Sequence, residues 1–471
     1  MVYLCGQATG QNVFTNQKTE APIMKNNLDR RNFITTLSVA GVGVAMGIPK
    51  VSSAAAPGKP ALLGGPKAHP ASFPGWPVFD QTEENALLSV LKSKNWGRLG
   101  GTVVSKFEKE YSAMTGAKHT LGVSSGTAAL LTMMGALDLG PGDEVIMPVY
   151  TFIATYNAVV LNYALPILID TDLESFQIDA NKIEAAINPQ TKVIMPVHIG
   201  GSPADLDKIM EITNKTRIPL IEDACQAHLA EWKGKKVGTY GLGGAFSFQA
   251  SKNLNCAEGG AIITNDENFA TTCYTFHNQG QGGQTTAFNP GVGTRGTNLR
   301  LTEFQGNLLI AQMTRLIAQS NRRSENANYL TKMLKEIPGI MPAKLYEGTT
   351  KSAYHLYMFR YDKNHFEGMS REKFLQALNA EGIPCSSGYG MMNKDSYVTG
   401  LAKNKHYLKI YGEKAMNAWL ERNVCPQNDK LSGEQGVWLF QTMLLGTRKD
   451  MDQIVEAIKK LQQNAAALAK A

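Results

Sequence analysis

The sequence lacks the features that would mark a metal site, a disulfide-stabilised fold or a membrane span. Its six cysteines lie far apart and form no Cys-x-x-Cys pair, so neither a disulfide framework nor a metal site is indicated. Charged residues make up only 18% of the chain, and the net charge of +7 includes no dense Lys/Arg run, which argues against nucleic acid binding. No apolar run is long enough for a permanent membrane helix. These absences favour a globular protein, and 471 residues allow two domains with a sizeable core.

The first 56 residues are typical of an export signal rather than of a folded domain. Arg30 and Arg31 form a twin-arginine pattern, a weakly apolar run covers residues 35–48, and small residues at 51–56 suit a signal peptidase. We predict export by the twin-arginine pathway to the periplasm, with the cytoplasm as the alternative location. Met24 is an alternative start of translation, and the exact cleavage position stays open.

Beyond the leader, the sequence predicts an arm and two domains. Residues 57–82 are rich in Pro, Gly and Ala and predict a linker or N-terminal arm. Strand and helix patterns then alternate through residues 83–325, which predicts a large α/β domain with a mostly parallel sheet and helices on both faces. Residues 326–471 predict a smaller C-terminal α/β domain. In such sheets ligands bind at the carboxyl ends of the strands, so we expect the site at that edge of the sheet. The predicted strands are 119–123, 144–149, 165–169, 192–196 and 219–222.

A single lysine, Lys252, lies in a polar turn between two apolar runs, residues 245–248 and 261–264. Burial disfavours the ammonium form and lowers the pKa of a lysine, which prepares it to form a Schiff base. A lysine on a solvated loop is the alternative for an isolated Ser-Lys-Asn. The upstream sequence favours the first interpretation.

The segment Ser125, Gly126 and Thr127 follows a strand and begins a helix. Free N–H groups and the helix dipole make such a terminus a site for an anion such as a phosphate. An ordinary helix cap is the alternative.

Two further strand ends carry side chains that suit a flat heteroaromatic ring. Phe152 follows the second strand and is placed to stack on such a ring, although a core aromatic is the alternative. Asp223, at the end of an apolar strand, needs a cationic partner, and a protonated pyridinium nitrogen is one. Gln226 and His228 are placed to bind the ring substituents. The alternative is an aspartate in a structural network.

Together these pieces specify pyridoxal 5′-phosphate (PLP) better than any one of them alone. Lys252 would form the Schiff base, and Asp223 would keep the ring nitrogen protonated so that the ring accepts electrons. Released by the substrate amine, Lys252 would also move the proton between Cα and C4′.

With these residues in place, the chain resembles the DegT/DnrJ/EryC1/StrS family of aminotransferases, which are PLP-dependent enzymes of fold type I. The resemblance covers about residues 60–465. It is carried by SGTAAL at 125–130, TFIAT at 151–155, EDACQAH at 222–228, FSF at 246–248, SKN at 251–253 and EGG at 258–260.

The resemblance implies a role for individual positions. Lys252 matches the Schiff-base lysine, Asp223 the partner of the pyridinium nitrogen, and Gln226 a contact to the ring hydroxyl. Phosphate contacts are implied for Ser247, Gly126 and Thr127, and ring stacking for Phe152. No metal is implied.

Three further positions follow from the same resemblance. Asn298 matches a loop that in relatives reaches the phosphate of the neighbouring subunit, which implies a homodimer with shared active sites. His198 and Tyr354 are expected to line the substrate side of the site.

The family transfers an amino group from glutamate or glutamine to a keto sugar or a keto cyclitol. Nucleotide sugars are scarce outside the cytoplasm, so export favours a free or polymer-linked sugar or a cyclitol as acceptor. Lys252 argues against the family branch of sugar dehydratases, which carry histidine there. The alternatives are a PLP-dependent lyase, aldolase or racemase, and a non-catalytic PLP-binding sensor.

Overall fold

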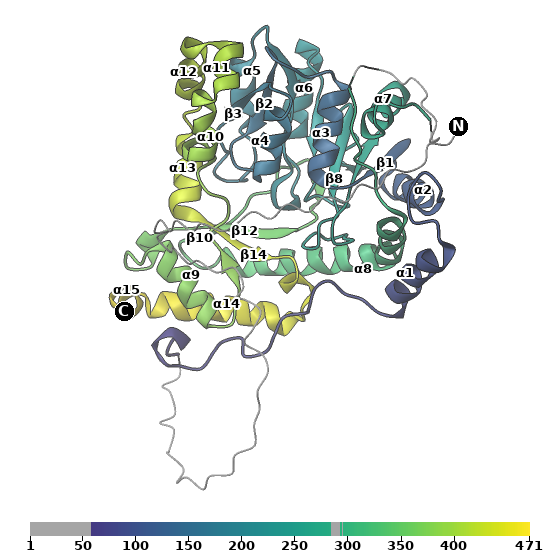
Figure 1. The fold of residues 1–471 in the computed structure, drawn as a ribbon. Coiled ribbons are helices and arrows are strands. Elements are labelled where there is room, and N and C mark those ends of the chain that lie inside the picture. Colours follow the sequence, from purple (N-terminus) through teal and green to yellow (C-terminus); the bar gives the residue numbers. More distant parts are fainter. Residues whose placement is uncertain (1–57, 284–292, 294) are drawn as a thin grey trace, which may run out of the picture. The chain divides into compact units, whose positions relative to one another are not determined.

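The structure, a computed structural model, describes residues 58–283, 293 and 295–471 (Figure 1). The predicted leader, residues 1–56, lies outside the described residues. Its role in export therefore stays a prediction.

The described chain alternates helices and short strands. The helices are α1 (Gln81–Ser93), α2 (Val103–Thr115), α3 (Gly126–Ala136), α4 (Ile153–Val160), α5 (Ile183–Ala186), α6 (Leu206–Thr216), α7 (Glu267–His277), α8 (Glu303–Leu334), α9 (Arg371–Ala380), α10 (Ser396–Thr399), α11 (Lys405–Tyr411), α12 (Glu413–Arg422), α13 (Pro426–Lys430), α14 (Arg448–Gln463) and α15 (Ala465–Lys470). The strands are β1 (His119–Val123), β2 (Glu144–Pro148), β3 (Leu165–Ile169), β4 (Thr191–Ile194), β5 (Ile221–Asp223), β6 (Glu231–Trp232), β7 (Lys235–Lys236), β8 (Gly243–Ser247), β9 (Gly260–Thr264), β10 (Ile340–Pro342), β11 (Thr349–Lys351), β12 (Leu356–Tyr361), β13 (Cys385–Ser386) and β14 (Gly436–Phe440).

The large domain contains a mostly parallel sheet made of two groups of strands that lie edge to edge. One group has the order β1-β9-β8-β5 and the other β3-β2-β4. Parallel bridges from Ile194 to Leu220 and from Val197 to Asp223 join β4 to β5. Only β9 runs antiparallel to its neighbours, β1 and β8. The predicted α/β fold is therefore confirmed, and the carboxyl ends of β2, β5 and β8 meet at one edge.

Helices cover both faces of this sheet, as the apolar pattern of its strands requires. Along β9, Ile262 packs into a cluster with α3, whereas Ala261 and Ile263 pack into a second cluster with α2 and α8. Successive side chains of a strand point to opposite faces, so the two clusters lie on opposite sides. Strands buried on both faces explain the nearly continuous apolar runs in the sequence.

The predicted boundary between residues 325 and 326 falls inside the long helix α8. A capping box formed by Thr302 and Gln305 begins this helix. Its first half packs on the large domain, and Ala327, Leu330 and Leu334 of its last turns pack into the core of the small domain. One continuous helix therefore belongs to both domains, which a boundary drawn from sequence does not show.

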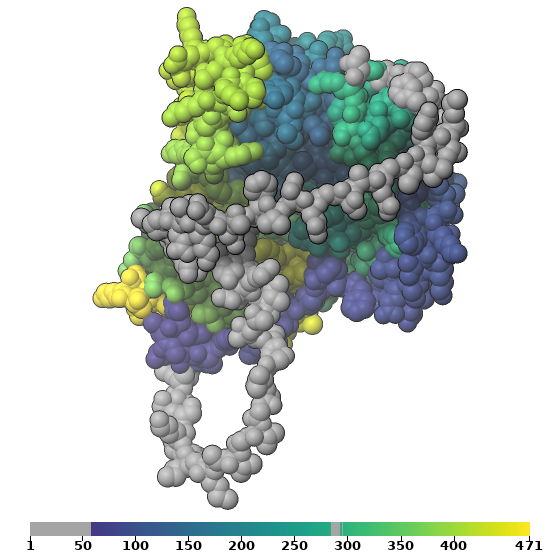
Figure 2. Space-filling model, viewed as in Figure 1, coloured from purple at the N-terminus to yellow at the C-terminus, as the bar shows by residue number. Residues whose placement is uncertain are grey.

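The predicted small domain is also interrupted, because residues 392–425 return to the large domain. Val398, Leu401 and Trp419 belong to the same apolar cluster as β2 and β3. The indole N–H of Trp419 donates to the carbonyl oxygen of Pro166 at 2.6 Å. In Figures 1 and 2 the yellow-green segment from α10 to α13 lies along the blue large domain. The small domain proper consists of the antiparallel sheet β10-β12-β14-β13 with α9, α14 and α15.

The predicted linker at residues 57–82 is an ordered arm over its described part. Two backbone N–H groups of the arm, those of Ala61 and Ala68, each donate to the carboxylate of Glu381 at 2.8 Å. The His69 ring lies 3.0 Å from the carboxylate of Asp450 on α14. These contacts fix the arm, purple in Figure 1, against the small domain.

Three further features concern only the part of the chain that the structure describes. No helix there combines the length and apolar character that a membrane span needs. No group of three or more metal-ligand side chains occurs there. The five cysteines of this part are free thiols.

Candidate active site

A cavity of about 700 Å³ lies at the carboxyl edge of the large-domain sheet and is also lined by residues of the arm and the small domain. It brings together most of the residues that the sequence singled out. Its wall includes Ser125, Gly126, Thr127, Thr151, Phe152, Thr155, Asp223, Cys225, Gln226, Ser247, Lys252, and, from the arm and the small domain, Trp76, His355, Tyr389, Trp438, Gln441 and Thr442.

Lys252 lies in a turn just beyond β8 and faces this cavity. Burial disfavours its ammonium and lowers the pKa of Lys252, although the neighbouring Cys225 and the carboxylate of Asp223 oppose the shift. Lys252 forms no ion pair with any carboxylate of the described residues. A partly desolvated, unpaired lysine is the state in which an amine acts as a nucleophile toward an aldehyde.

Asp223 ends β5 and is fixed by two hydrogen bonds. The hydroxyl of Thr155 donates to its Oδ2 at 2.9 Å, and the backbone N–H of Cys225 donates to its Oδ1 at 3.1 Å. Thr151 lies 2.8 Å from Thr155, and because the proton of Thr155 is used on Asp223, Thr151 is the donor of that pair. The carboxylate is held in place and keeps acceptor capacity for a donor in the cavity.

The start of α3 has the geometry of an anion site. Ser125 is the helix cap, since its hydroxyl accepts from the N–H of Ala128 at 3.0 Å. A Cβ atom on Gly126 would lie 2.7 Å from Cβ of Ser247 and 2.9 Å from Sγ of Cys225. Glycine is therefore required for α3 to approach β8 this closely. The approach brings the helix N-terminus and the Ser247 side chain to one end of the cavity.

Phe152 and Gln226 lie on the wall where a ring would be held. The Phe152 side chain is 56% exposed, which is unusual for a large aromatic and leaves its surface free for a ring to cover. Gln226 accepts from the N–H of Gly200 at 2.8 Å, and its carboxamide donates to the hydroxyl of Tyr389 at 2.7 Å. Tyr389 in turn packs edge-on against Trp438 at 4.6 Å between ring centroids.

Two predicted site residues, His198 and His228, do not line the cavity. His198 is fully buried, lies 3.0 Å from the carboxylate of Glu222, and accepts from the N–H of Ala204 at 3.1 Å. His228 is buried as well and bonds to the carbonyl oxygen of Ser247 at 2.8 Å. Both rings are used in buried hydrogen bonds outside the cavity wall, so the expectation that they contact the substrate or the cofactor differs from the structure.

Tyr354 and Asn298 also lie outside this cavity. The Tyr354 hydroxyl donates to Asn328 at 3.3 Å in a different cavity, and the next residue, His355, takes the place on the wall. Asn298 is exposed and pairs with Asn278 by a backbone bridge. Its predicted contact with a neighbouring subunit stays a prediction.

Several residues of the wall were not predicted from the sequence. Thr155 had a signal, because it ends the TFIAT motif one helical turn after Thr151. Trp76, Tyr389, Trp438 and Gln441 come from the arm and the small domain, and only the tertiary fold brings them to the lysine.

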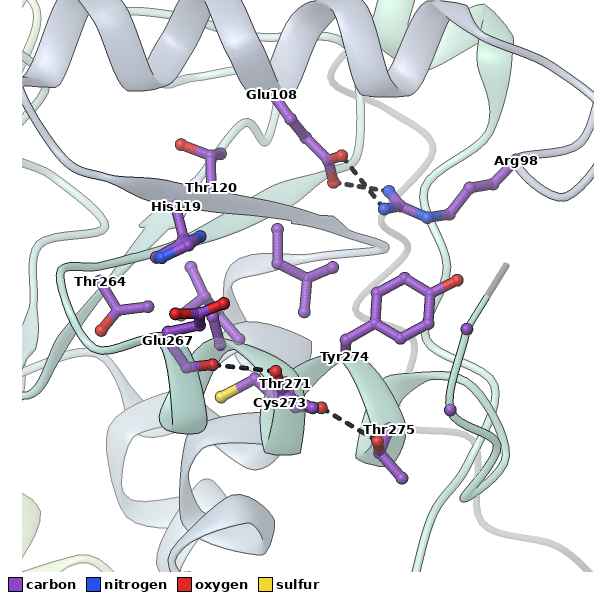
Figure 3. A pocket seen from close by; sticks show the side chains of 15 residues that line it. Arg98, Glu108, His119, Thr120, Thr264, Glu267, Thr271, Cys273, Tyr274 and Thr275 are labelled. Atoms are coloured by element: carbon purple, nitrogen blue, oxygen red, sulfur yellow. Dashed lines mark hydrogen bonds and ion pairs between the residues drawn. The ribbon is translucent and has the colours of Figure 1, made fainter. Parts of the chain in front are cut away.

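A second cavity, of about 450 Å³, lies between β1, β9, α2 and α7 and contains none of the predicted site residues (Figure 3). Arg98 and Glu108 form a two-pronged ion pair there, with N–O distances of 2.6 and 3.1 Å. Glu108 also accepts from the N–H of Gly122 at 2.6 Å. The charges of this pair neutralise each other, which is typical of a structural contact.

The fold and the first cavity together define a PLP-dependent aminotransferase of fold type I. A model of the DegT/DnrJ/EryC1/StrS aminotransferase family matches residues 77–459, and the chain belongs to that family.

Relatives of known name support the assignment. The chain is 33% identical over 410 residues to an L-glutamine:2-deoxy-scyllo-inosose aminotransferase of Streptomyces kanamyceticus, covering 84% of this chain and 95% of the relative. It is 32% identical over 392 residues to a 3-amino-5-hydroxybenzoate synthase of Amycolatopsis mediterranei, covering 82% and 96%. A crystal structure of 3-amino-5-hydroxybenzoic acid synthase superposes with a TM-score of 0.73 at 31% identity, covering 85% of this chain and 99% of that one.

Proposed function

We propose that the protein transfers the amino group of L-glutamine to the keto group of a polyhydroxylated six-membered ring, a keto cyclitol or keto sugar. The observation that carries the proposal is that Lys252 and Asp223 line one cavity at the carboxyl edge of the sheet. The names of the relatives support glutamine as donor and a keto cyclitol as acceptor. The lyase, aldolase, racemase and sensor alternatives have no such support.

The described residues fit PLP as the cofactor. When bound, PLP supplies an electron sink for bond breaking at the Cα of the donor. Asp223, held by Thr155, would keep a proton on the ring nitrogen. Lys252 would hold the cofactor aldehyde and, once released, move the proton at Cα. Gln226 would bind the ring hydroxyl.

The two ends of the cofactor have their own partners. The phosphate would lie against Gly126, Thr127 and Ser247, where the helix dipole of α3 favours an anion. Phe152 would cover one face of the ring. Side chains of the small domain, Tyr389, Trp438 and Gln441 among them, form part of the same wall.

We further propose a homodimer in which Asn298 completes the phosphate site of the partner. Asn298 is exposed and does not line its own cavity, which supports a role outside its own chain. Helix α1 presents exposed apolar side chains at Leu88 and Leu91, with exposed fractions of 44% and 49%. Such a face is suited to burial by a second copy of the chain.

The leader supports a proposal of export by the twin-arginine pathway with PLP already bound. The expected result of replacing Arg30 and Arg31 by lysine is retention of the protein in the cytoplasmic fraction. Equal export of this variant and the unchanged chain would overturn the proposal.

The experiment that tests the function follows the cofactor by its visible absorbance. Addition of L-glutamine to the PLP-loaded protein should remove the visible band with release of one equivalent of keto acid, and a keto cyclitol such as 2-deoxy-scyllo-inosose should restore it. Lys252→Ala should lack the band and the activity, whereas Lys192→Ala, which changes an exposed lysine on β4, should retain both. Absence of any change with glutamine and with glutamate would overturn the proposal.

A further inference from the structure

A buried arginine without a counterion lies directly behind the wall of the active-site cavity. Arg323, on α8, is fully buried, and it forms no ion pair with the described residues. Its guanidinium lies 5.2 Å from the centre of the Trp76 ring, and its Nη1 has no hydrogen-bond partner among the described residues. Burial lowers the pKa of Arg323 to about 9. An uncompensated cation at such a position is costly to the fold.

The guanidinium fixes the orientation of Gln441 on the cavity wall. Nε and Nη2 of Arg323 both donate to Oε1 of Gln441, at 2.9 and 2.5 Å. Because a guanidinium has only donors, the carboxamide oxygen must face it, and the NH₂ group of Gln441 is turned away from it. That group makes only a long contact of 3.5 Å to the carbonyl oxygen of Ser251. Its donor capacity is therefore available to a ligand beside Lys252.

The positive charge acts on the same part of the cavity. Burial lowers the pKa of His355, a wall residue, and the nearby positive charges of Lys252 and Arg323 add to the shift. The arm closes this side, because the indole N–H of Trp76 donates to the carbonyl oxygen of Ala250 at 2.9 Å. This end of the cavity therefore combines a positive charge with the amide donor of Gln441 and the hydroxyl of Thr442, which suits a carboxylate.

Two anionic groups enter the site in the proposed reaction, the phosphate of PLP and the carboxylate of the amino donor. Residues that would bind the phosphate are already identified. The phosphate of PLP fits the start of α3 and Ser247. The carboxylate of the amino donor has no partner in that set, and Arg323 has no counterion in the described chain.

We propose that the wall formed by Trp76, Gln441 and Thr442 binds the α-carboxylate of the amino-acid donor, with Arg323 as the positioning residue that orients Gln441 and supplies the positive charge behind it. This inference rests on the proposed function. It makes the site specific for donors that carry a carboxylate next to the amine, and it leaves the keto acceptor to the other walls.

Gln441→Glu separates binding from stability. The new carboxylate would pair with Arg323, so the fold should be at least as stable as before, whereas a donor carboxylate would now be repelled. We expect the apparent dissociation constant for L-glutamine, measured from the loss of the visible band in a single half-reaction, to rise about tenfold or more. Arg323→Met should raise it similarly. The absorbance of the resting PLP-loaded protein should be unchanged in both variants.

Two controls make the result specific. Arg322→Met changes the neighbouring arginine, whose Nε and Nη2 bind the carbonyl oxygen of Gly446 outside the cavity, and it should leave glutamine binding unchanged. Glutaminol, which has an alcohol in place of the carboxylate, is measured by competition and should bind the variants and the unchanged protein equally.

The outcomes separate the two proposals. Unchanged glutamine binding in Gln441→Glu and Arg323→Met would overturn the carboxylate site, and so would an equal loss of glutamine and glutaminol, which marks a structural role alone. If the unchanged protein reacts with neither glutamine nor glutamate, the proposed function itself fails, and the carboxylate site fails with it.

Discussion

Thr155 and Asp223 are 68 residues apart in the sequence, and the hydroxyl of Thr155 donates a 2.9 Å hydrogen bond to the carboxylate of Asp223. The first turn of α4 thereby orients the side chain at the end of β5. Parallel strands place both at the same edge of the sheet. The carboxylate that would hold the ring proton is thus positioned by a neighbouring strand–helix unit.

Thr155→Val removes this hydroxyl while keeping the shape of the side chain. We expect PLP to bind as before and kcat to fall about tenfold, because Asp223 loses one of two hydrogen bonds that orient it. Steady-state kinetics and the absorbance of the bound cofactor provide the measurement. Thr132→Val is the matched control, since the buried hydroxyl of Thr132 has no partner among the described residues. Equal kcat values for Thr155→Val and the control would show that Thr155 does not orient Asp223 for catalysis.

Gly126→Ala tests the close approach of α3 to β8. The added methyl group would meet Ser247 and Cys225 within 3 Å, so α3 must move away. We expect a loss of about 1–3 kcal/mol in the free energy of unfolding, together with weaker PLP binding. Urea unfolding and titration of the apoprotein with PLP measure the two effects. Gly140→Ala, where a Cβ atom has no neighbour within 4 Å, should change neither.

The lowered pKa of Glu222 makes the free energy of unfolding depend on pH. Burial alone would raise its pKa, but hydrogen bonds from His198 and from the N–H groups of Gly241 and Gly238 hold the pKa of Glu222 below its ordinary value. Its contribution is therefore fully present above the pKa of an unfolded glutamate, about 4.3, and is lost as the pH falls through the lower folded pKa.

Glu222→Gln should accordingly be less stable than the unchanged protein at pH 7, by about 3 kcal/mol. The difference should shrink as the pH falls below about 4. Urea unfolding at a series of pH values measures it, with Glu421→Gln at an exposed position as the control. A difference that does not vary with pH would show that Glu222 is not charged in the folded protein.

The proposed sharing of active sites in a homodimer predicts complementation between two inactive variants. Lys252→Ala lacks the lysine, and Asn298→Ala lacks the group proposed to reach the partner's phosphate. A mixed dimer contains one site with both residues intact, so mixing and reassociating the two variants should restore about a quarter of the activity. Activity no higher than the sum of the separate variants would contradict the shared site.

Sequence reasoning located the lysine and aspartate because both depend on local patterns. Apolar runs ending in a polar turn define β8 and the Lys252 turn, and the strands at His119–Val123 and Leu165–Ile169 have the bounds that the sequence predicts. Where a residue is held by its own strand end or helix start, short-range sequence is sufficient.

The rest depends on contacts that a linear pattern does not contain. His198 follows a strand, as a site residue would, yet its buried ring pairs with Glu222 and does not line the cavity. Tyr389 and Gln441 reach the cavity only because the small domain folds back over it. The return of Trp419 to the large domain likewise follows from tertiary packing.

The contacts of the arm limit where the proposed leader can be cleaved without loss of structure. Ala61 and His69 bind the small domain, and the indole N–H of Trp76 donates to Ala250 in the turn that carries Lys252. Removal of a leader at the small residues 51–56 leaves all three attachments in place. A cut beyond Trp76 would remove one hydrogen bond that supports the lysine turn and one residue of the cavity wall. The proposed cleavage of the leader therefore has to leave the stretch from Ala61 to Trp76 attached, because that stretch supports the turn of the reactive lysine.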